Sequence, residues 1–181
     1  MNKQRPAAQV RLISLLYFTF GYLLVLPFAI SLAEAAGPPT SITGNTVTGN
    51  FSTQVVPPSP GANVYGIRGG QTAGTNLFHS FGQFNVGAGD IAQFQTPTLS
   101  PNVAISNILG RINGQTSASQ IFGTIDSATF YPAANLFLMN PYGFLFGPTA
   151  TVNVGGMVAF TSADYLRLEG PGGSGTFYAD P

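Results

Sequence analysis

The side chains that could do chemistry are few and lie far apart along the chain. The sequence has 181 residues, no cysteine and one histidine, His79. A metal site built from Cys and His ligands needs several such residues, and a histidine that acts as a base is normally oriented by a carboxylate. No aspartate or glutamate lies within ten residues of His79. We therefore expect a structural role for His79, with no metal site and no bound cofactor.

The acidic and basic residues beyond residue 35 are too few to form an obvious catalytic cleft. They include no Asp-x-Asp calcium loop and no clustered carboxylate pair, and no glycine-rich nucleotide loop is present. The acidic residues are Asp90, Asp126, Asp164, Glu169 and Asp180, and the basic residues are Arg68, Arg111 and Arg167. We expect no enzymatic activity. The alternative is a β-helical carbohydrate-active enzyme, which would need Asp90, Asp126 and Asp164 to converge on one face.

The overall composition excludes two further classes of protein. Charged residues make up 7% of the chain, where about 25% is usual, and the formal net charge is +0. Nucleic-acid binding depends largely on clustered Lys and Arg, so we expect no nucleic-acid partner. Hydrophobic residues make up 44%, which is too many for a disordered tail and enough for the core of one domain.

The N-terminal segment has the pattern of an export signal. Lys3, Arg5 and Arg11 precede an uncharged apolar run, Leu12–Leu32, and Ala33-Glu34-Ala35 then matches the A-x-A pattern of a cleavage site. We interpret residues 1–35 as a signal peptide that directs export across the inner membrane and is removed. A membrane anchor is the alternative, because about 20 apolar residues can cross a bilayer.

Beyond Ile42 the sequence predicts many short strands and no helix of ordinary length. No stretch of ten residues has helical spacing of apolar residues without an interrupting Gly or Pro. The predicted strands are 46–48, 93–95, 105–112, 120–122, 135–139, 144–146, 151–154 and 157–161. Strands this short favour a coil wound into a stack over a sandwich of longer strands. The sequence has no exact repeat of about 20 to 25 residues that would decide between these two architectures.

Two local features predict how some of these strands lie. The runs Leu136–Met139 and Phe144–Phe146 are apolar at every position, so we expect both to be covered on both faces. Between them, Asn140-Pro141-Tyr142-Gly143 has the residue preferences of a type I turn: Asn can bond to its own backbone, Pro fixes φ, and Gly follows at the fourth position. We expect a rigid corner there.

Three stretches in this order resemble a known family. They are GTNLFHSFGQFNV at 74–86, ISNILGRINGQTSASQIFGTI at 105–125 and ANLFLMNPYGFLFGPTATVNVGG at 134–156. Together they closely resemble the secretion domain of two-partner secretion exoproteins, the filamentous haemagglutinin N-terminal domain, from about Ile42 to Tyr165. This resemblance implies an all-β fold, a right-handed parallel β-helix (a single-stranded, pectate-lyase-like solenoid) with an N-terminal cap and extra-helical strands.

The resemblance also implies a function and partners. In this family the domain directs an exported chain to an outer-membrane TpsB-type transporter through its periplasmic POTRA domains. We therefore expect an adhesin-like protein that passes through the periplasm of a Gram-negative-type bacterium and is secreted or reaches the cell surface. Any ligand on a host cell or other surface would bind a distal region outside this sequence. An anchored structural protein is a further alternative, which a mature N-terminus near Ala36 would exclude.

The resemblance assigns site residues and domain boundaries. The family's NPNG turn matches Asn140, Pro141 and Gly143, with Tyr142 in place of the second Asn. The residues expected to matter for secretion and partner recognition are Asn140, Pro141, Tyr142, Gly143 and Phe144, together with Asn76, Leu77, Phe78, His79 and Phe81. Each is equally expected to be a corner or core residue. The expected organisation is a signal peptide at 1–35, the secretion domain at 36–165, and the beginning of a further element, cut short, at 166–181.

Overall fold

The computed structural model describes residues 37–46, 51–96, 104–170 and 173–180. The predicted signal peptide, and all of the strand expected at 46–48 except Thr46, lie outside these residues. Residues 38–181 belong to one structural unit.

The described residues form fifteen strands and no helix, as the dense Gly and Pro punctuation predicts. The strands are β1 (Ser41–Gly44), β2 (Thr53–Val56), β3 (Val64–Gly69), β4 (Gln71–Ala73), β5 (Asn76–Asn85), β6 (Ile91–Phe94), β7 (Asn107–Ile112), β8 (Ser119–Ile121), β9 (Thr124–Asp126), β10 (Asn135–Met139), β11 (Phe144–Phe146), β12 (Thr151–Asn153), β13 (Val158–Thr161), β14 (Tyr165–Gly170) and β15 (Gly173–Tyr178).

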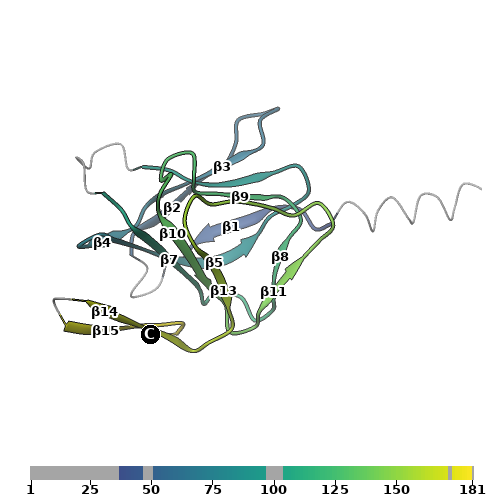
Figure 1. Ribbon diagram of the computed structural model, residues 1–181. Coiled ribbons are helices and arrows are strands. Elements are labelled where there is room, and N and C mark those ends of the chain that lie inside the picture. The colour runs from purple at the N-terminus through teal and green to yellow at the C-terminus, as the bar shows by residue number, and fades with distance from the viewer. Residues whose placement is uncertain (1–36, 47–50, 97–103, 171–172, 181) are drawn as a thin grey trace, which may run out of the picture. The chain divides into compact units, whose positions relative to one another are not determined.

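Most of these strands belong to a parallel solenoid with three sheets (Figure 1). Sheet A contains the parallel strands β5, β7, β10 and β13, sheet B contains β3, β6, β9 and β12, and sheet C contains β8 and β11. Each pass of the chain through sheets A, C and B, which we call a coil, stacks on the previous one. About three coils are complete, so the prediction of an all-β parallel β-helix is confirmed.

Antiparallel strands close the N-terminal end of the solenoid. β1 and β4 both pair with β5 at the edge of sheet A, and β2 pairs with β3 at the edge of sheet B. A hairpin of β14 and β15 lies outside the solenoid sheets. These strands are the expected N-terminal cap and extra-helical elements.

The core is made of apolar side chains that stack coil upon coil. We call three such stacks the inward columns: Leu77, Ile108, Leu136 and Val158 in sheet A; Val86, Ile121 and Phe146 in sheet C; Ala92, Ile125 and Val152 in sheet B. Every member except the last of each column is buried. Close packing of these residues between coils contributes to the apolar burial of the core, together with large buried side chains outside the columns such as Phe81, Phe84 and Phe94.

The expectation that both apolar runs are covered on both faces is right for one and wrong for the other. In β10, Leu136 and Leu138 face the core, while Met139 is buried in a second cluster that includes Phe177 of the hairpin. In β11, by contrast, Leu145 and Phe146 are exposed. Phe146 is exposed because β11 has β8 on one side and no described strand on the other. Leu145 lies on the outer face, and the cluster around Phe177 that buries Met139 does not include it.

Strand β5 explains why its aromatic residues do not alternate as a regular strand requires. Phe81 and Phe84 are three residues apart, yet both are fully buried in the core. The pairing with β1 shifts here, from Thr43 opposite Gln83 to Gly44 opposite Phe81, so Gly82 is an extra residue in β5. Such a β-bulge restores the inward direction after one additional residue.

Candidate functional site

The NPYG segment forms the tight corner that its sequence predicts. The backbone amide of Gly143 donates to the carbonyl oxygen of Asn140 at 2.8 Å, which closes the four-residue turn. The Oδ1 atom of Asn140 accepts a second bond, from the amide of Tyr142 at 2.9 Å. Gly143 has a φ of 84°, a left-handed conformation that favours glycine. This corner links the end of β10 directly to β11.

Asn140 is a fully buried polar residue that anchors the corner to the preceding coil. Its Nδ2 group donates to the carbonyl oxygen of Ser117 at 3.2 Å and to Oγ of Ser119 at 3.0 Å. Its backbone amide donates to the carbonyl oxygen of Thr161 in the next strand of sheet A. A buried amide needs such partners, because an unsatisfied polar group is costly away from water.

The same hydrogen-bond network continues to the first coil through Gln115. Its Nε2 group donates to the carbonyl oxygen of Ser117 at 2.9 Å and to Oγ of Ser119 at 3.1 Å, while its Oε1 accepts from the amide of Phe84 at 3.1 Å. The network therefore joins three successive coils at the corner between sheets A and C. The sequence analysis missed Gln115, Ser117 and Ser119, since nothing in their spacing connects them to Asn140.

The outer part of the corner is presented to solvent. Pro141 and Tyr142 are exposed, Tyr142 with 55% of its surface accessible. Phe144 is half-buried and packs edge-to-face on Phe160, with ring centroids 5.3 Å apart. The predicted motif thus divides into a buried anchor, Asn140, and an exposed tip, Pro141 and Tyr142.

The second predicted segment, in β5, lies mainly inside the protein. Leu77, His79 and Phe81 face the core and are buried, whereas Phe78 faces outward beneath the hairpin. Phe81 pairs with Ile112 in the register of sheet A and so lies near the NPYG end of the strands. Asn76 lies at the opposite end of β5. The structure does not bring the two predicted segments together as one exposed patch.

Asn76 belongs to a ladder of asparagines across the three coils. Asn107 donates from Nδ2 to Oδ1 of Asn76 at 2.8 Å, and Asn135 donates in the same way to Asn107 at 2.9 Å. The sequence carries a signal for this ladder that the analysis missed: Asn-Leu-Phe at 76, Asn-Ile-Leu at 107 and Asn-Leu-Phe at 135. Stacked amides of this kind hold neighbouring strands in register.

His79 is buried in the core. Its Nδ1 lies 3.3 Å from Oγ1 of Thr53, and its ring packs near Phe81 and Phe94 at centroid distances of 5.9 and 5.5 Å. Burial lowers the pKa of His79 from 6.5 to about 3, because the charged form would lose its hydration. His79 is therefore neutral in the folded protein at neutral pH.

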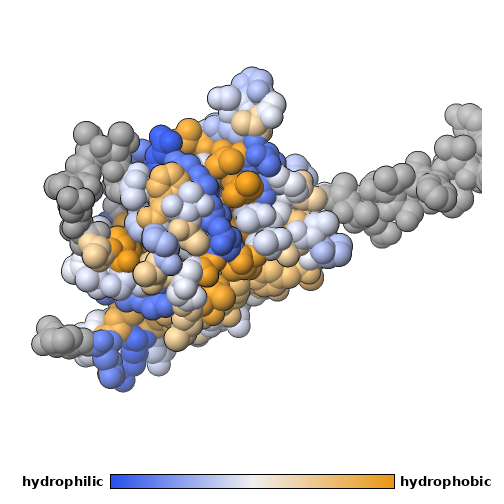
Figure 2. Space-filling model, turned by 45° about the horizontal axis from the view of Figure 1, so that its top comes forward, coloured by the Kyte–Doolittle hydropathy of each residue, from blue (hydrophilic) through white to orange (hydrophobic). Residues whose placement is uncertain are grey.

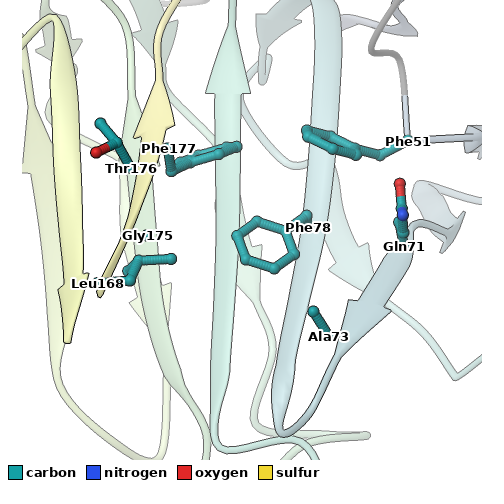
Figure 3. Close-up of a pocket in the computed structure, with 8 residues that line it drawn as sticks. All are labelled: Phe51, Gln71, Ala73, Phe78, Leu168, Gly175, Thr176 and Phe177. Atoms are coloured by element: carbon teal, nitrogen blue, oxygen red, sulfur yellow. The ribbon is translucent and has the colours of Figure 1, made fainter. Parts of the chain in front are cut away.

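An aromatic cluster joins the hairpin to the outer face of sheet A. Phe51, Phe78 and Phe177 lie with ring centroids 5.3 to 6.0 Å apart and border an open groove of about 280 Å³ (Figure 3). The guanidinium of Arg111 lies over the ring of Phe51 at 4.7 Å and donates from Nη1 to the carbonyl oxygen of Tyr178 at 3.2 Å. Burial lowers the pKa of Arg111, and the nearby Asp180 offsets this effect only in part.

Two of the three carboxylates that an enzyme would need, Asp90 and Asp126, have structural partners. Asp90 accepts from Oγ1 of Thr40, and Asp126 accepts from Thr129, Gln93 and Asn153. Burial would raise the pKa of Asp126, but these hydrogen bonds outweigh it and lower that pKa. Asp126 pairs with Gln93 on the neighbouring strand. Gln93 lies three residues after Asp90, so Asp90 and Asp126 are offset by about 10 Å along the strand direction.

The described part of the chain contains neither a cluster of metal ligands nor a membrane-spanning helix. Among residues 37–46, 51–96, 104–170 and 173–180, no three His, Cys, Asp or Glu side chains lie close enough to hold one metal ion. Over the same ranges, no helix has the length and hydropathy needed to span a membrane.

Comparison with known families shows to which family the chain belongs. The sequence model of the TPS secretion domain matches residues 43–176, which includes the NPYG corner, β5 and most of the hairpin. The chain belongs to the TPS secretion domain family. No curated protein matches the chain. A TPS secretion domain is the domain by which a two-partner secretion exoprotein is recognised for export. The match confirms the family resemblance of the three sequence stretches and the general function predicted from them.

Proposed function

We propose that this TPS secretion domain directs its chain, after signal-peptide export to the periplasm, to an outer-membrane transporter through the transporter's POTRA domains. The observation that carries the proposal is the divided NPYG corner. Asn140 is buried in a network across three coils, whereas Pro141 and Tyr142 project into solvent from the same four-residue turn. A rigid turn that presents an exposed aromatic residue is suited to contact a partner.

The composition supports the same route. A chain without cysteine forms no disulfide that would have to pass a narrow pore as a closed loop. A parallel solenoid gains stability only as successive coils stack, so its folding is expected to be slow enough for the chain to pass the pore extended. Folding outside the cell would then oppose backward movement.

The first test is secretion with and without the transporter. We expect the protein in the culture medium only when the cognate transporter is produced in the same host. Equal release in both strains would contradict the proposal.

The second test separates partner contact from stability. Tyr142→Ala removes the exposed tip of the corner, and Tyr165→Ala is a matched control because Tyr165 is 51% exposed on the hairpin strand β14. We expect Tyr142→Ala to reduce secretion while its urea midpoint stays at the wild-type value, and Tyr165→Ala to leave secretion unchanged. Equal secretion of the two variants would mean that Tyr142 does not contact the transporter.

A further inference from the structure

Two residues of the N-terminal cap have a strained backbone. Phe51 and Ser52, in the turn that leads into β2, have φ angles of 51° and 54°. Among the described residues they are the only ones besides glycines with a left-handed φ. A bulky residue such as phenylalanine rarely adopts this conformation, so the surrounding contacts must hold it there. We call these two residues the cap turn.

The contacts of the Phe51 side chain come from sheet A and from the hairpin. Its ring centroid lies 5.8 Å from that of Phe78 in β5 and 6.0 Å from that of Phe177 in β15. The guanidinium of Arg111 in β7 lies over both the Phe51 ring, at 4.7 Å, and the Phe177 ring, at 5.6 Å. The hairpin therefore contacts a turn that lies more than 120 residues earlier in the sequence.

Arg111 joins the cap turn, sheet A and the hairpin at one point. Its side chain is only 3% exposed. Its Nε donates to Oγ of Ser80 at 3.1 Å, and its Nη1 donates to the carbonyl oxygen of Tyr178 at 3.2 Å. A planar guanidinium can face aromatic rings while it donates hydrogen bonds in its own plane. Without the hairpin, Arg111 would lose one of these bonds and one of its two rings, and the cap turn would lose part of its support.

The hairpin has the pattern of a cover with one apolar side. In β14, Leu166 and Leu168 are partly buried in the aromatic cluster, whereas Arg167 and Glu169 are exposed. Figure 2 shows hydrophilic residues beside the hairpin tip, at the lower left. Among the described strands, β14 and β15 pair only with each other. Side-chain contacts, not strand pairing, hold the hairpin on sheet A, so it can detach without breaking a ladder of the solenoid.

We propose that the hairpin and the cap turn are conformationally coupled: docking of β14 and β15 holds the cap turn in its strained conformation, and release of the hairpin frees it. Because Phe51 and Phe177 are far apart in the sequence, their contact forms only after the intervening coils have stacked. The cap is therefore completed late in folding, when the hairpin docks.

The experiment is hydrogen exchange of the full chain, measured by mass spectrometry. The reporters are peptides that cover residues 51–56 and 66–73. The second contains the amide of Gly70, which donates to the carbonyl oxygen of Ser52 at 3.4 Å. Phe177→Ala should speed exchange in both peptides at least about tenfold, while β6 and β9 in sheet B exchange as in the wild type.

The matched control is Tyr178→Ala, at the next position of the same strand. The side chain of Tyr178 is 53% exposed, and the variant keeps the carbonyl oxygen that accepts from Arg111. This control should exchange as the wild type does at the cap turn. If Phe177→Ala is unfolded by circular dichroism, Phe177→Leu replaces it, because leucine keeps an apolar side chain at the site but has no ring.

A double variant tests whether the strained turn is what the hairpin holds. Asparagine adopts a left-handed φ more readily than phenylalanine and lacks the ring that contacts Phe177. In a Phe51→Asn background, Phe177→Ala should therefore change exchange at the cap turn less than it does in the wild type. An equal change in both backgrounds would overturn the coupling.

Two further outcomes would overturn the proposal. One is unchanged exchange at the cap turn in a folded Phe177 variant. The other is an equal rise in exchange over all the sheets, because that would be a general loss of stability. The inference does not depend on the transporter, so its failure would leave the proposed function intact.

Discussion

The buried histidine makes the stability of the domain depend on pH. His79 is neutral in the folded protein, where burial lowers its pKa to about 3, whereas in the unfolded chain its pKa is near the ordinary 6.5. Between these values the unfolded chain binds more protons than the folded one. The stabilisation that depends on a neutral His79 is therefore fully present above pH 6.5 and is lost progressively as the pH falls toward 3.

The size of the effect follows from the difference in pKa. At pH 5, which is 1.5 units below the unfolded value, protonation of the unfolded chain should lower the free energy of unfolding by about 2 kcal/mol. Asp126 does not contribute to the difference between pH 7.5 and pH 5. Its lowered pKa means that its stabilisation is present above its ordinary value of 3.8 and is lost only as the pH falls through a still lower value.

The assay is urea unfolding at pH 7.5 and pH 5 for the wild type and His79→Phe. The variant keeps a ring beside Phe81 and Phe94 but cannot titrate, and Oγ1 of Thr53 still accepts from the amide of Ser80. We expect the wild type to lose about 2 kcal/mol more than the variant on acidification. If both proteins lose the same amount, His79 is not held neutral by burial and the reasoning is wrong.

Four further predictions concern the corner, the ladder and the hairpin. Asn140→Ala should lower the free energy of unfolding by about 1 to 3 kcal/mol in urea titrations, because it removes bonds to Ser117 and Ser119 in a buried site. Gly143→Val should reduce secretion more than Asn140→Ala does, since a β-branched residue is strained at a φ of 84°; normal secretion at an unchanged urea midpoint would show that the turn is unimportant. Asn107→Ala breaks both bonds of the asparagine ladder and should destabilise the domain more than Asn76→Ala, which breaks one, as thermal unfolding would reveal. Phe177→Ala should free the hairpin, so that limited proteolysis cuts within β14 or β15 while the solenoid stays intact; an unchanged digestion pattern would show that other contacts hold it.

The sequence by itself determined the class of fold and the local corners. Gly and Pro punctuation excluded ordinary helices, and the strands at 135–139 and 144–146 have the predicted boundaries. The NPYG turn was predictable because its geometry depends on its own four residues. The family of the chain was recognisable because its three motifs are contiguous stretches of sequence.

The sequence did not predict the features of a strand that depend on its neighbours in the sheet. β5 is a single ten-residue strand, but its bulge at Gly82 breaks the alternation that would have predicted it. The coils also differ in length: Leu77, Ile108, Leu136 and Val158 are aligned in space although 31, 28 and 22 residues separate them. No fixed repeat in the sequence could therefore indicate the stacking.

Only the tertiary structure decided which faces are buried and what the motif residues do. β10 and β11 have equally apolar sequences, yet the outer face of β10 is covered by the hairpin while Leu145 and Phe146 of β11 are exposed. Asn140 likewise became a buried anchor through Ser117 and Ser119, which lie more than 20 residues earlier in the chain. The physical reason is the same in both cases: a turn is fixed by local backbone preferences, but burial and hydrogen-bond partners depend on the segments that fold against it.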